Sequence, residues 1–309
     1  MSLEDIISRK EVSDFLEKNG WQPFDVITHG ATSDVLIIEK THEKCALKLA
    51  REKAREIVVR EHRILTYLNA TGLESNVPRV GEWLVEIDGF IMEYLLSPAL
   101  EVRHSENWPV ELARALRRIH RVNLPEIDGI PDDRPDIALT VSRRLVDRCS
   151  IIHNKEDYWK SLPREYIPAL TMVRNHHDTY IVLIPEVEKA LTNTQPAITH
   201  GDLAGDNIMS RSDGTPVFVD WGEIRISSGL LDLACLLTFT DWSEETIGCF
   251  LAEYYRRERL EEILPDIRIL CRFYRYLTCV NCLWWLIQPE EEKLDTVGRA
   301  FFEKVLAKL

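Results

Sequence analysis

The sequence predicts an α+β fold of two lobes, a small lobe with an antiparallel β-sheet and a larger lobe that is mainly helical. The chain has 309 residues, and at roughly 150 residues per domain this length suits two domains or two lobes of one fold. Runs rich in β-branched residues fall before residue 95, and apolar residues at helical spacing dominate after residue 98. We therefore expect a small lobe over residues 1–95 and a large lobe over residues 96–309.

The small lobe is expected to contain an N-terminal helix, five strands and one inserted helix. Apolar positions at helical spacing indicate an amphipathic helix over residues 4–18, which Asn19-Gly20 ends. Strand-like runs lie at residues 24–29, 35–39, 45–49, 79–85 and 89–94. Between the third and fourth runs, residues 51–68 have one apolar face and one charged face, as a surface helix does. This order predicts a five-stranded sheet with one helix inserted after the third strand.

The large lobe is expected to be helical apart from one short β segment. A helix is predicted over residues 110–122, and the proline- and glycine-rich residues 125–136 predict a loop. Further helical patterns follow over residues 137–150 and 155–192, with breaks at three prolines. A compact β segment spans residues 197–219, and helices resume from residue 230 to the end.

Composition excludes several classes of protein. The chain has 38 Lys and Arg against 51 Asp and Glu, a net charge of −13, which disfavours binding to nucleic acid or to an anionic membrane. No signal peptide is recognisable, and the uncharged residues 276–289 are too few to span a membrane. Seven scattered cysteines suit reduced thiols, and the lone Cys279-x-x-Cys282 reads as part of a core helix rather than a zinc or redox site. We expect a cytoplasmic protein.

One stretch has the spacing of a catalytic motif. Residues 198–209 read I-T-H-G-D-L-A-G-D-N-I-M, so that Asp202 precedes Asn207 by five positions, and Asp220 follows the strand-like residues 216–219. This is the D-x-x-x-x-N arrangement of a phosphotransfer loop followed by a second aspartate. Phosphoryl transfer needs a positioned nucleophile and neutralisation of phosphate charge. Asp202 would orient an acceptor hydroxyl and take its proton, and Asn207 and Asp220 would bind Mg²⁺.

On these motifs the chain resembles the aminoglycoside phosphotransferase and choline kinase superfamily, which has a protein-kinase-like fold. Residues 200–203 with Asn207 are similar to the catalytic loop of that family, and residues 220–222, D-W-G, to its metal-binding segment. The resemblance implies that Lys48 contacts the α- and β-phosphates of a nucleotide. It also implies that Glu61 is the helix glutamate that pairs with this lysine.

The resemblance also locates the remaining nucleotide-binding segments. Residues 92–95, M-E-Y-L, resemble the hinge whose backbone binds adenine, which assigns Glu93, Tyr94 and Leu95 to the base. The loop over residues 28–34 would lie over the phosphates and contributes Gly30, Thr32 and Ser33. This loop has one glycine, unlike the G-x-G-x-x-G of protein kinases, and no A-P-E segment follows residue 222. Both departures point away from a protein kinase.

The implied activity is transfer of the γ-phosphate of ATP or GTP to a substrate hydroxyl, with Mg²⁺. An aminoglycoside or a related hydroxylated antibiotic or amine is the first acceptor class, which implies antibiotic resistance. A metabolic kinase for choline, ethanolamine or a sugar is the alternative, and a nucleotide-binding pseudokinase or regulator is a second alternative. The acceptor is expected to be cationic. The sequence leaves open its identity, the choice between ATP and GTP, and the oligomeric state.

Several other polar or aromatic groups have two interpretations each. His200 is expected to fix the loop backbone rather than transfer protons, and Asp206 to cap a turn rather than take part in catalysis. His176-His177 reads as a surface pair rather than a metal site. The acidic residues between positions 244 and 266 form either a solvated helix face or a wall that binds an amine. The following aromatic residues form either a cation–π cage or core packing, and packing is favoured for the last two: Trp242, Tyr254, Tyr255, Trp284 and Trp285.

Overall fold

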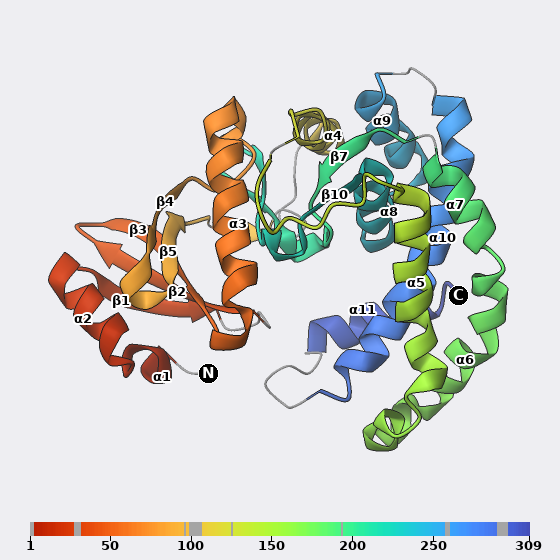
Figure 1. The fold of residues 1–309 in the computed structure, drawn as a ribbon, viewed down its shortest axis with the longest axis horizontal. Coiled ribbons are helices and arrows are strands. Elements are labelled where there is room, and N and C mark those ends of the chain that lie inside the picture. The colour runs from red at the N-terminus through yellow and green to blue at the C-terminus, as the bar shows by residue number, and fades with distance from the viewer. Residues whose placement is uncertain are drawn as a thin grey trace. The chain divides into compact units, whose positions relative to one another are not determined.

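A computed structural model describes residues 3–27, 32–95, 97–98, 107–124, 126–192, 194–256, 260–288 and 296–309. The chain forms two compact units (Figure 1). The first unit contains residues 1–131, 200–225 and 248–254, and the second contains residues 132–199, 226–247 and 255–309. These units are divided by compactness, whereas the expected division at residue 95 rests on the change from strand-like to helical sequence patterns. The lobes over residues 1–95 and 96–309 therefore stay a prediction.

A five-stranded antiparallel sheet begins the first unit (Figure 1). Its strands are β1 (Gln22–Ile27), β2 (Ser33–Lys40), β3 (Glu43–Ala50), β4 (Val80–Leu84) and β5 (Gly89–Glu93). Their spatial order is β1-β2-β3-β5-β4. The predicted α+β class and the five-stranded sheet are confirmed.

The two faces of this sheet are covered by different helices. Alternate side chains of β2 and β3 on one face form a core with the helices α1 (Leu3–Ile7) and α2 (Lys10–Asn19). The single helix predicted over residues 4–18 is wrong in this respect, because Ser8 and Arg9 separate two helices. Lys48 on β3 projects to the other face and reaches α3 (Arg55–Leu68). Gly72, with φ of 83°, lies just beyond the end of α3.

A short hairpin places the predicted catalytic residues in the same unit. The strands β8 (Ile208–Ser210) and β9 (Pro216–Phe218) pair antiparallel, and β6 (Ser97–Pro98) adds to the outer edge of β8. The helix α4 (Trp108–His120) and the C-terminal part of α9 (Glu244–Tyr254) complete the first unit. Asn207 therefore precedes β8 directly, and Asp220 follows β9 after one residue.

The second unit is mainly helical, as predicted. Its helices are α5 (Ile137–Asn154), α6 (Ile167–Ile181), α7 (Ile184–Thr192), α8 (Gly229–Phe239), α10 (Leu260–Trp285) and α11 (Thr296–Leu306). The strand β7 (Pro196–Thr199) pairs with β10 (Arg225–Ser228), which the sequence did not predict. Cys279 and Cys282 are buried within α10, which confirms the core-helix interpretation of this pair. No helix in the described part of the chain has the length and apolar character to cross a membrane.

Candidate active site

An ion-pair cluster joins three of the predicted residues. The Lys48 Nζ lies 2.7 Å from Glu61 Oε2 and 2.9 Å from Asp220 Oδ1. The backbone N–H of Trp221 donates to Glu61 Oε1 over 3.3 Å. β3 supplies the lysine, α3 the glutamate and the segment after β9 the aspartate. Three segments far apart in the sequence therefore meet at one ammonium group.

Burial makes this cluster electrostatically strong. Lys48 is 3% exposed and Glu61 is 1% exposed, whereas the Asp220 side chain is 45% exposed. Burial alone would lower the pKa of Lys48, but the carboxylates of Glu61 and Asp220 outweigh it and raise that pKa. Burial would raise the pKa of Asp220, but Lys48 holds it below its ordinary value. Lys48 therefore keeps its positive charge, and Asp220 presents an ionised carboxylate to solvent.

The loop before β8 is fixed by a histidine and a glycine. His200 is buried, its Nε2 donates to the Val219 carbonyl over 2.7 Å, and its Nδ1 accepts the Asp202 N–H over 3.4 Å. Gly201 has φ of 84°, and a Cβ at this position would overlap the backbone carbonyl of Glu223. His200 thus holds backbone on both sides of the loop, in agreement with the expected role.

Asp202 and Asn207 contact each other directly. The Asn207 Nδ2 donates to the Asp202 carbonyl over 2.7 Å and to Asp202 Oδ2 over 3.1 Å. Surrounding protein atoms raise the pKa of Asp202, and the nearby carboxylates of Asp220 and Glu223 raise it further, while His200 opposes them. The residue is nevertheless exposed, so water limits the size of this rise. Asp202 is therefore a reachable carboxylate with enhanced basicity.

The arrangement of polar oxygens fits a magnesium ion. Because Asn207 turns its Nδ2 toward Asp202, its Oδ1 is left as an acceptor, and Asp220 supplies a partly exposed carboxylate. In the described residues, no group of three or more His, Cys, Asp or Glu side chains could hold a metal ion. Mg²⁺ does not need such a cage, since it keeps several waters and uses one or two protein oxygens together with substrate phosphates.

The structure describes only the end of the loop over residues 28–34. Gly30 lies outside the described residues. Ser33 is buried at the start of β2, and the Thr32 carbonyl accepts the Arg51 N–H over 3.2 Å. The neighbouring Asp34 is fully buried and binds Arg51 and a second arginine, Arg9 from the residues between α1 and α2. These contacts tie the end of the loop to the rest of the small sheet.

In the expected hinge segment, the backbone N–H and the side chain of Glu93 both have partners within the protein. The Glu93 N–H donates to the Arg79 carbonyl over 2.8 Å, and its carboxylate binds Arg211. Tyr94 and Leu95 follow β5 and belong to no strand. A base that binds through backbone N–H groups of this segment would therefore use Tyr94 and Leu95, and the Glu93 side chain is engaged elsewhere.

Sequence reasoning missed other residues around the site. Arg60, next to Glu61 on α3, donates to the Gly222 carbonyl over 2.6 Å and so holds the predicted metal-binding segment. Ile27 pairs with Val35, and Val35 with Lys48, so their side chains share the Lys48 face of the sheet. Ile27 is 48% exposed there. In the sequence, this apolar surface could have been predicted from Ile27, which lies directly before the loop over residues 28–34.

The structure distinguishes between the alternative interpretations of the histidine pair and of two of the aromatic residues. His177 is partly buried against Tyr276, and its Nδ1 lies 3.0 Å from the Tyr276 hydroxyl, so the histidine pair is not simply a surface feature. Tyr254 is buried and its hydroxyl lies 2.6 Å from His120 Nδ1. Trp284 packs against Tyr158 with ring centroids 5.3 Å apart. These tyrosine and tryptophan contacts favour packing over a cation–π cage.

The acidic residues after position 243 are mainly solvent-facing. Glu244, Glu245, Glu261 and Glu262 are exposed, and Glu253 binds Arg114 over 2.8 Å. Glu258 lies outside the described residues. A solvated face therefore accounts for most of this stretch.

Comparison with known proteins places this site in a family. The model of the phosphotransferase enzyme family matches residues 24–267. An ethanolamine kinase of Plasmodium vivax is similar in structure, with a TM-score of 0.63 and 17% identity, over 93% of this chain and 81% of that chain. An ADP-bound aminoglycoside phosphotransferase, APH(2'')-Ib, has a TM-score of 0.60 and 15% identity, over 96% of each chain. A choline kinase of Cryptosporidium parvum has a TM-score of 0.61 and 13% identity, over 94% of this chain and 89% of that chain. No curated protein sequence matches the chain significantly.

At these identities the similar structures establish the fold. They confirm the expectation of a protein-kinase-like architecture with an N-terminal antiparallel sheet and a mainly helical remainder. The family match covers the sheet except for the first two residues of β1, and it includes the His200 loop and the segment around Asp220.

Proposed function

The chain belongs to the phosphotransferase enzyme family, and we propose that it transfers the γ-phosphate of a nucleoside triphosphate to a hydroxyl group of a small molecule. The observation that carries this proposal is the grouping of Lys48, Glu61 and Asp220 in one compact unit with the contacting pair Asp202 and Asn207. Phosphoryl transfer requires a positive charge near the phosphates, oxygen ligands for a metal ion, and a carboxylate that can reach the acceptor. Lys48 supplies the first, Asn207 and Asp220 the second, and Asp202 the third.

Each residue has a distinct part in the proposed reaction. Lys48 binds the α- and β-phosphates, and Glu61 keeps its ammonium group in place. Asn207 and Asp220 would hold Mg²⁺, which would supply neutralisation of the phosphate charge. Asp202 orients the acceptor hydroxyl and takes its proton, for which its raised pKa is favourable. A pseudokinase is disfavoured because none of these five groups is replaced.

The nucleotide is proposed to be ATP, with GTP as the alternative. The backbone of Tyr94 and Leu95 would bind the base, beneath the apolar Ile27 and Val35. The loop with Gly30, Thr32 and Ser33 would lie over the phosphates. The ADP in one similar kinase supports an adenine nucleotide.

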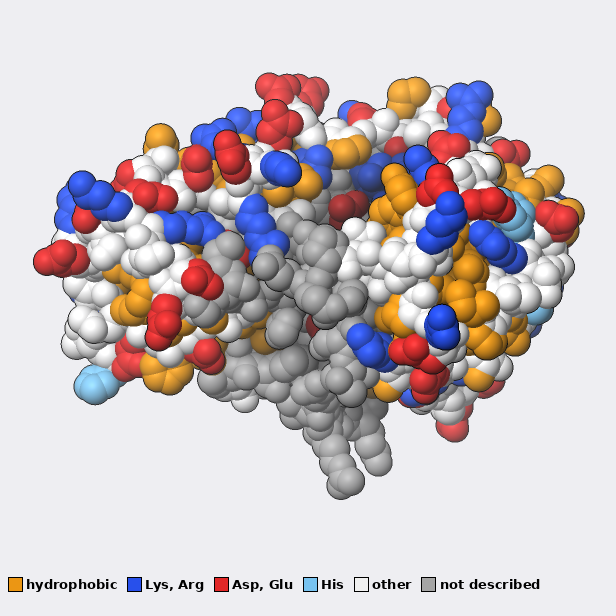
Figure 2. All heavy atoms as spheres, turned by 90° about the horizontal axis from the view of Figure 1, so that it is seen from below, with side chains coloured by type: hydrophobic (Ala, Val, Ile, Leu, Met, Phe, Trp, Pro, Cys, Tyr) orange, Lys and Arg blue, Asp and Glu red, His pale blue; other side chains and the backbone are white. Residues whose placement is uncertain are grey.

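The acceptor is proposed to be a cationic hydroxylated molecule, either an aminoglycoside or a metabolic alcohol such as choline or ethanolamine. Both classes occur among the structurally similar kinases. The net charge of −13 favours a cation. On the described part of the face drawn in Figure 2, basic and acidic side chains are interspersed and not gathered into a basic patch. An aminoglycoside acceptor would make antibiotic resistance the biological role.

The location of the protein is proposed to be the cytoplasm. Its seven free cysteines support this location.

The acceptor class is tested by nucleotide consumption with a panel of acceptors. Purified protein with Mg²⁺ and ATP, then GTP, would be given aminoglycosides, other hydroxylated antibiotics, choline, ethanolamine and amino sugars. We expect strong stimulation by one cationic class and phosphorylation of that acceptor in the mass spectrum. Stimulation only by a generic protein substrate would contradict the proposal.

A further inference from the structure

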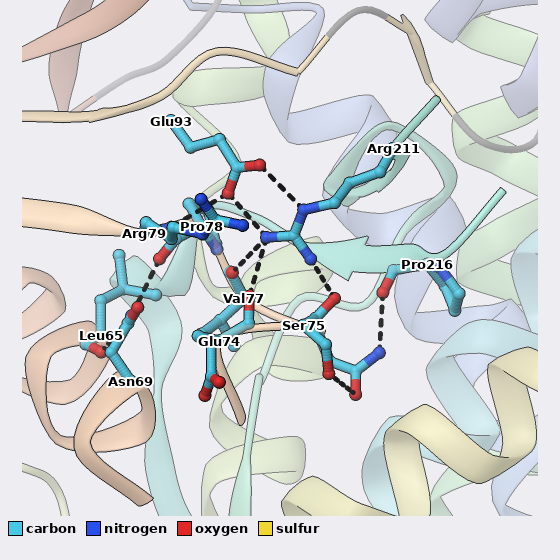
Figure 3. Close-up of polar contacts among 11 residues, drawn as sticks. Leu65, Asn69, Glu74, Ser75, Val77, Pro78, Arg79, Glu93, Arg211 and Pro216 are labelled. Atoms are coloured by element: carbon cyan, nitrogen blue, oxygen red, sulfur yellow. Dashed lines mark hydrogen bonds and ion pairs between the residues drawn. The ribbon is translucent and has the colours of Figure 1, made fainter. Parts of the chain in front are cut away.

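An arginine outside the catalytic motif lies at the centre of a dense polar network (Figure 3). The Arg211 Nε and Nη2 donate to the two carboxylate oxygens of Glu93 over 2.8 Å and 2.6 Å. Nη2 also donates to the carbonyls of Glu74 over 2.7 Å and Val77 over 3.2 Å, and Nη1 donates to the Ser75 carbonyl. The guanidinium thus binds a carboxylate and three backbone carbonyls at once.

The partners of Arg211 lie next to the proposed base-binding segment. Glu93 is the last residue of β5 and directly precedes Tyr94. Its Oε2 also accepts the Arg79 N–H over 3.2 Å. Burial would raise the pKa of Glu93, but the hydrogen bonds from Arg211 and Arg79 lower it. The carboxylate is therefore ionised at neutral pH, and it fixes the end of β5 from two sides.

Arg211 follows β8 directly, at the opposite end of the β8–β9 hairpin from the proposed metal-binding residues Asn207 and Asp220. β8 joins Asn207 to Arg211 through three residues, a distance of roughly 13 Å in extended chain. At one end the Val219 N–H donates to the Asn207 carbonyl over 2.9 Å, directly before Asp220. At the other end the Arg211 N–H donates to the Thr215 carbonyl over 3.0 Å. The hairpin therefore links the metal-binding end and the Arg211 end rigidly.

A second contact fixes the same hairpin to the loop after α3. The Asn76 side chain is fully buried, and its Nδ2 donates to the Pro216 carbonyl over 2.9 Å. The Asn76 carbonyl accepts the Phe218 N–H over 2.9 Å. The hairpin is thus attached to this loop along β9, while Arg211 attaches it to both the loop and the hinge.

We propose that Arg211 is a positioning residue that sets the distance between the base-binding hinge and the metal-binding residues Asn207 and Asp220. This inference rests on the proposed function, since it requires the base at Tyr94–Leu95 and the phosphates at Asn207 and Asp220. A nucleotide that contacts both ends is bound well only when the ends are correctly spaced. Arg211 acts through Glu93 and the hairpin, and it does not touch the nucleotide.

The test uses three variants and one matched control. Arg211→Ala removes all five contacts of the guanidinium, and Arg211→Lys keeps the charge but cannot reach all of these acceptors at once. Glu93→Gln keeps the shape of the carboxylate and removes its charge. Arg114→Ala is the control, because Arg114 forms exposed pairs with Glu111 and Glu253 in the same unit. Thermal unfolding shows which variants fold.

The measurements separate positioning from general damage. We expect Arg211→Ala to raise the KM for nucleotide roughly tenfold or more and to lower kcat, with smaller changes for Arg211→Lys and Glu93→Gln. The KM for the acceptor and the Ki of inorganic tripolyphosphate, which has no base, should change by less than about twofold. The control should behave as the unaltered protein.

Two results would overturn the inference. If nucleotide KM and kcat are unchanged in folded Arg211→Ala and Arg211→Lys, Arg211 does not position the hinge. If tripolyphosphate inhibition weakens in parallel with nucleotide KM, the variants damage the phosphate site and not its spacing from the hinge. A failure of the proposed function is distinct, because the unaltered protein would then neither transfer phosphate nor bind ADP in a calorimeter.

Discussion

Gly201, in the proposed catalytic loop, has a backbone conformation and surroundings that favour glycine. Its φ of 84° lies in the left-handed region, and the Glu223 carbonyl occupies the space that a Cβ would need. Gly129 has the same φ of 84°, but no heavy atom outside Gly129 and its two chain neighbours lies within 4 Å of the position that a Cβ would take there. A substitution at Gly129 therefore shows the cost of the left-handed backbone conformation alone, whereas the same substitution at Gly201 adds the cost of a steric clash.

We predict that Gly201→Ala lowers kcat about 100-fold or more, because displacing the loop moves Asp202 out of line. Gly129→Ala should lose only about 1 kcal/mol of stability and keep its turnover. Steady-state kinetics and chemical unfolding of both variants measure these effects. Equal kinetic losses in the two variants would show that the packing at Gly201 does not matter for activity.

The pKa of Asp202 predicts the acid side of the pH profile. Surrounding protein atoms are the largest cause that raises it, within the limit that exposure to water sets, and Asp220 and Glu223 add to the rise, whereas His200 and the hydrogen bond from Asn207 oppose it. Only the ionised carboxylate accepts a proton, so kcat/KM should fall as the pH drops through this raised pKa. The fall should therefore begin nearer neutrality than for an ordinary aspartate.

We predict that Glu223→Gln moves this acid limb to lower pH, because it removes one negative charge that raises the pKa of Asp202. The exposed Glu86→Gln serves as control and should leave the profile in place. Plots of log kcat/KM against pH for the three proteins measure the shift. An acid limb that stays fixed in Glu223→Gln would show that another group controls it.

At the scale of elements, β3 and α3 are joined by a buried ion pair. Lys48 and Glu61 are nearly inaccessible, and Asp220 completes the cluster from the segment after β9. Burying charges is costly unless they are paired. The pairing of Lys48 with Glu61 and Asp220 therefore offsets much of the cost of burying Lys48 and Glu61.

We predict that Lys48→Met lowers the free energy of unfolding by about 3–5 kcal/mol, since it leaves Glu61 buried without its ammonium partner. The double variant Lys48→Met/Glu61→Leu should regain most of this stability and none of the phosphate transfer. Urea unfolding and turnover assays test both statements. Recovery of activity in the double variant would contradict the role of the pair in nucleotide binding.

The elements were largely predictable from the sequence because local patterns encode them. The runs over residues 35–39 and 45–49 correspond to β2 and β3, and Ala46 and Lys48 share a face as their alternation implies. Local patterns do not encode contacts between distant side chains. The Arg211–Glu93 pair spans 118 residues, so a motif search had no means to find it. The break at Ser8–Arg9 was missed although the five-residue step from Ile7 to Val12 interrupts the helical spacing of the apolar residues.

At the scale of the whole molecule, the residues of the proposed chemistry fall in one of the two compact units. Residues 200–225 are far from the sheet in sequence but belong to the same unit. The hydrogen bonds of Asn76 and Arg211 contribute to this grouping by attaching the β8–β9 hairpin to the loop after α3, and the Lys48–Asp220 ion pair adds to it. Most of the second unit consists of helices without a recognisable motif, which is why the acceptor could not be read from the sequence.

Asp202 is proposed to promote phosphate transfer from a nucleotide bound by Lys48, Glu61, Asn207 and Asp220. The most direct measurement compares the unaltered protein with Asp202→Asn, using phosphorylation of the stimulating acceptor and calorimetric binding of ADP with Mg²⁺. We predict that transfer falls by a factor of about 100 or more, while ADP affinity and thermal unfolding stay close to those of the unaltered protein. If folded Asp202→Asn protein still binds ADP and transfers phosphate at an unchanged rate, the proposed role of Asp202 is wrong.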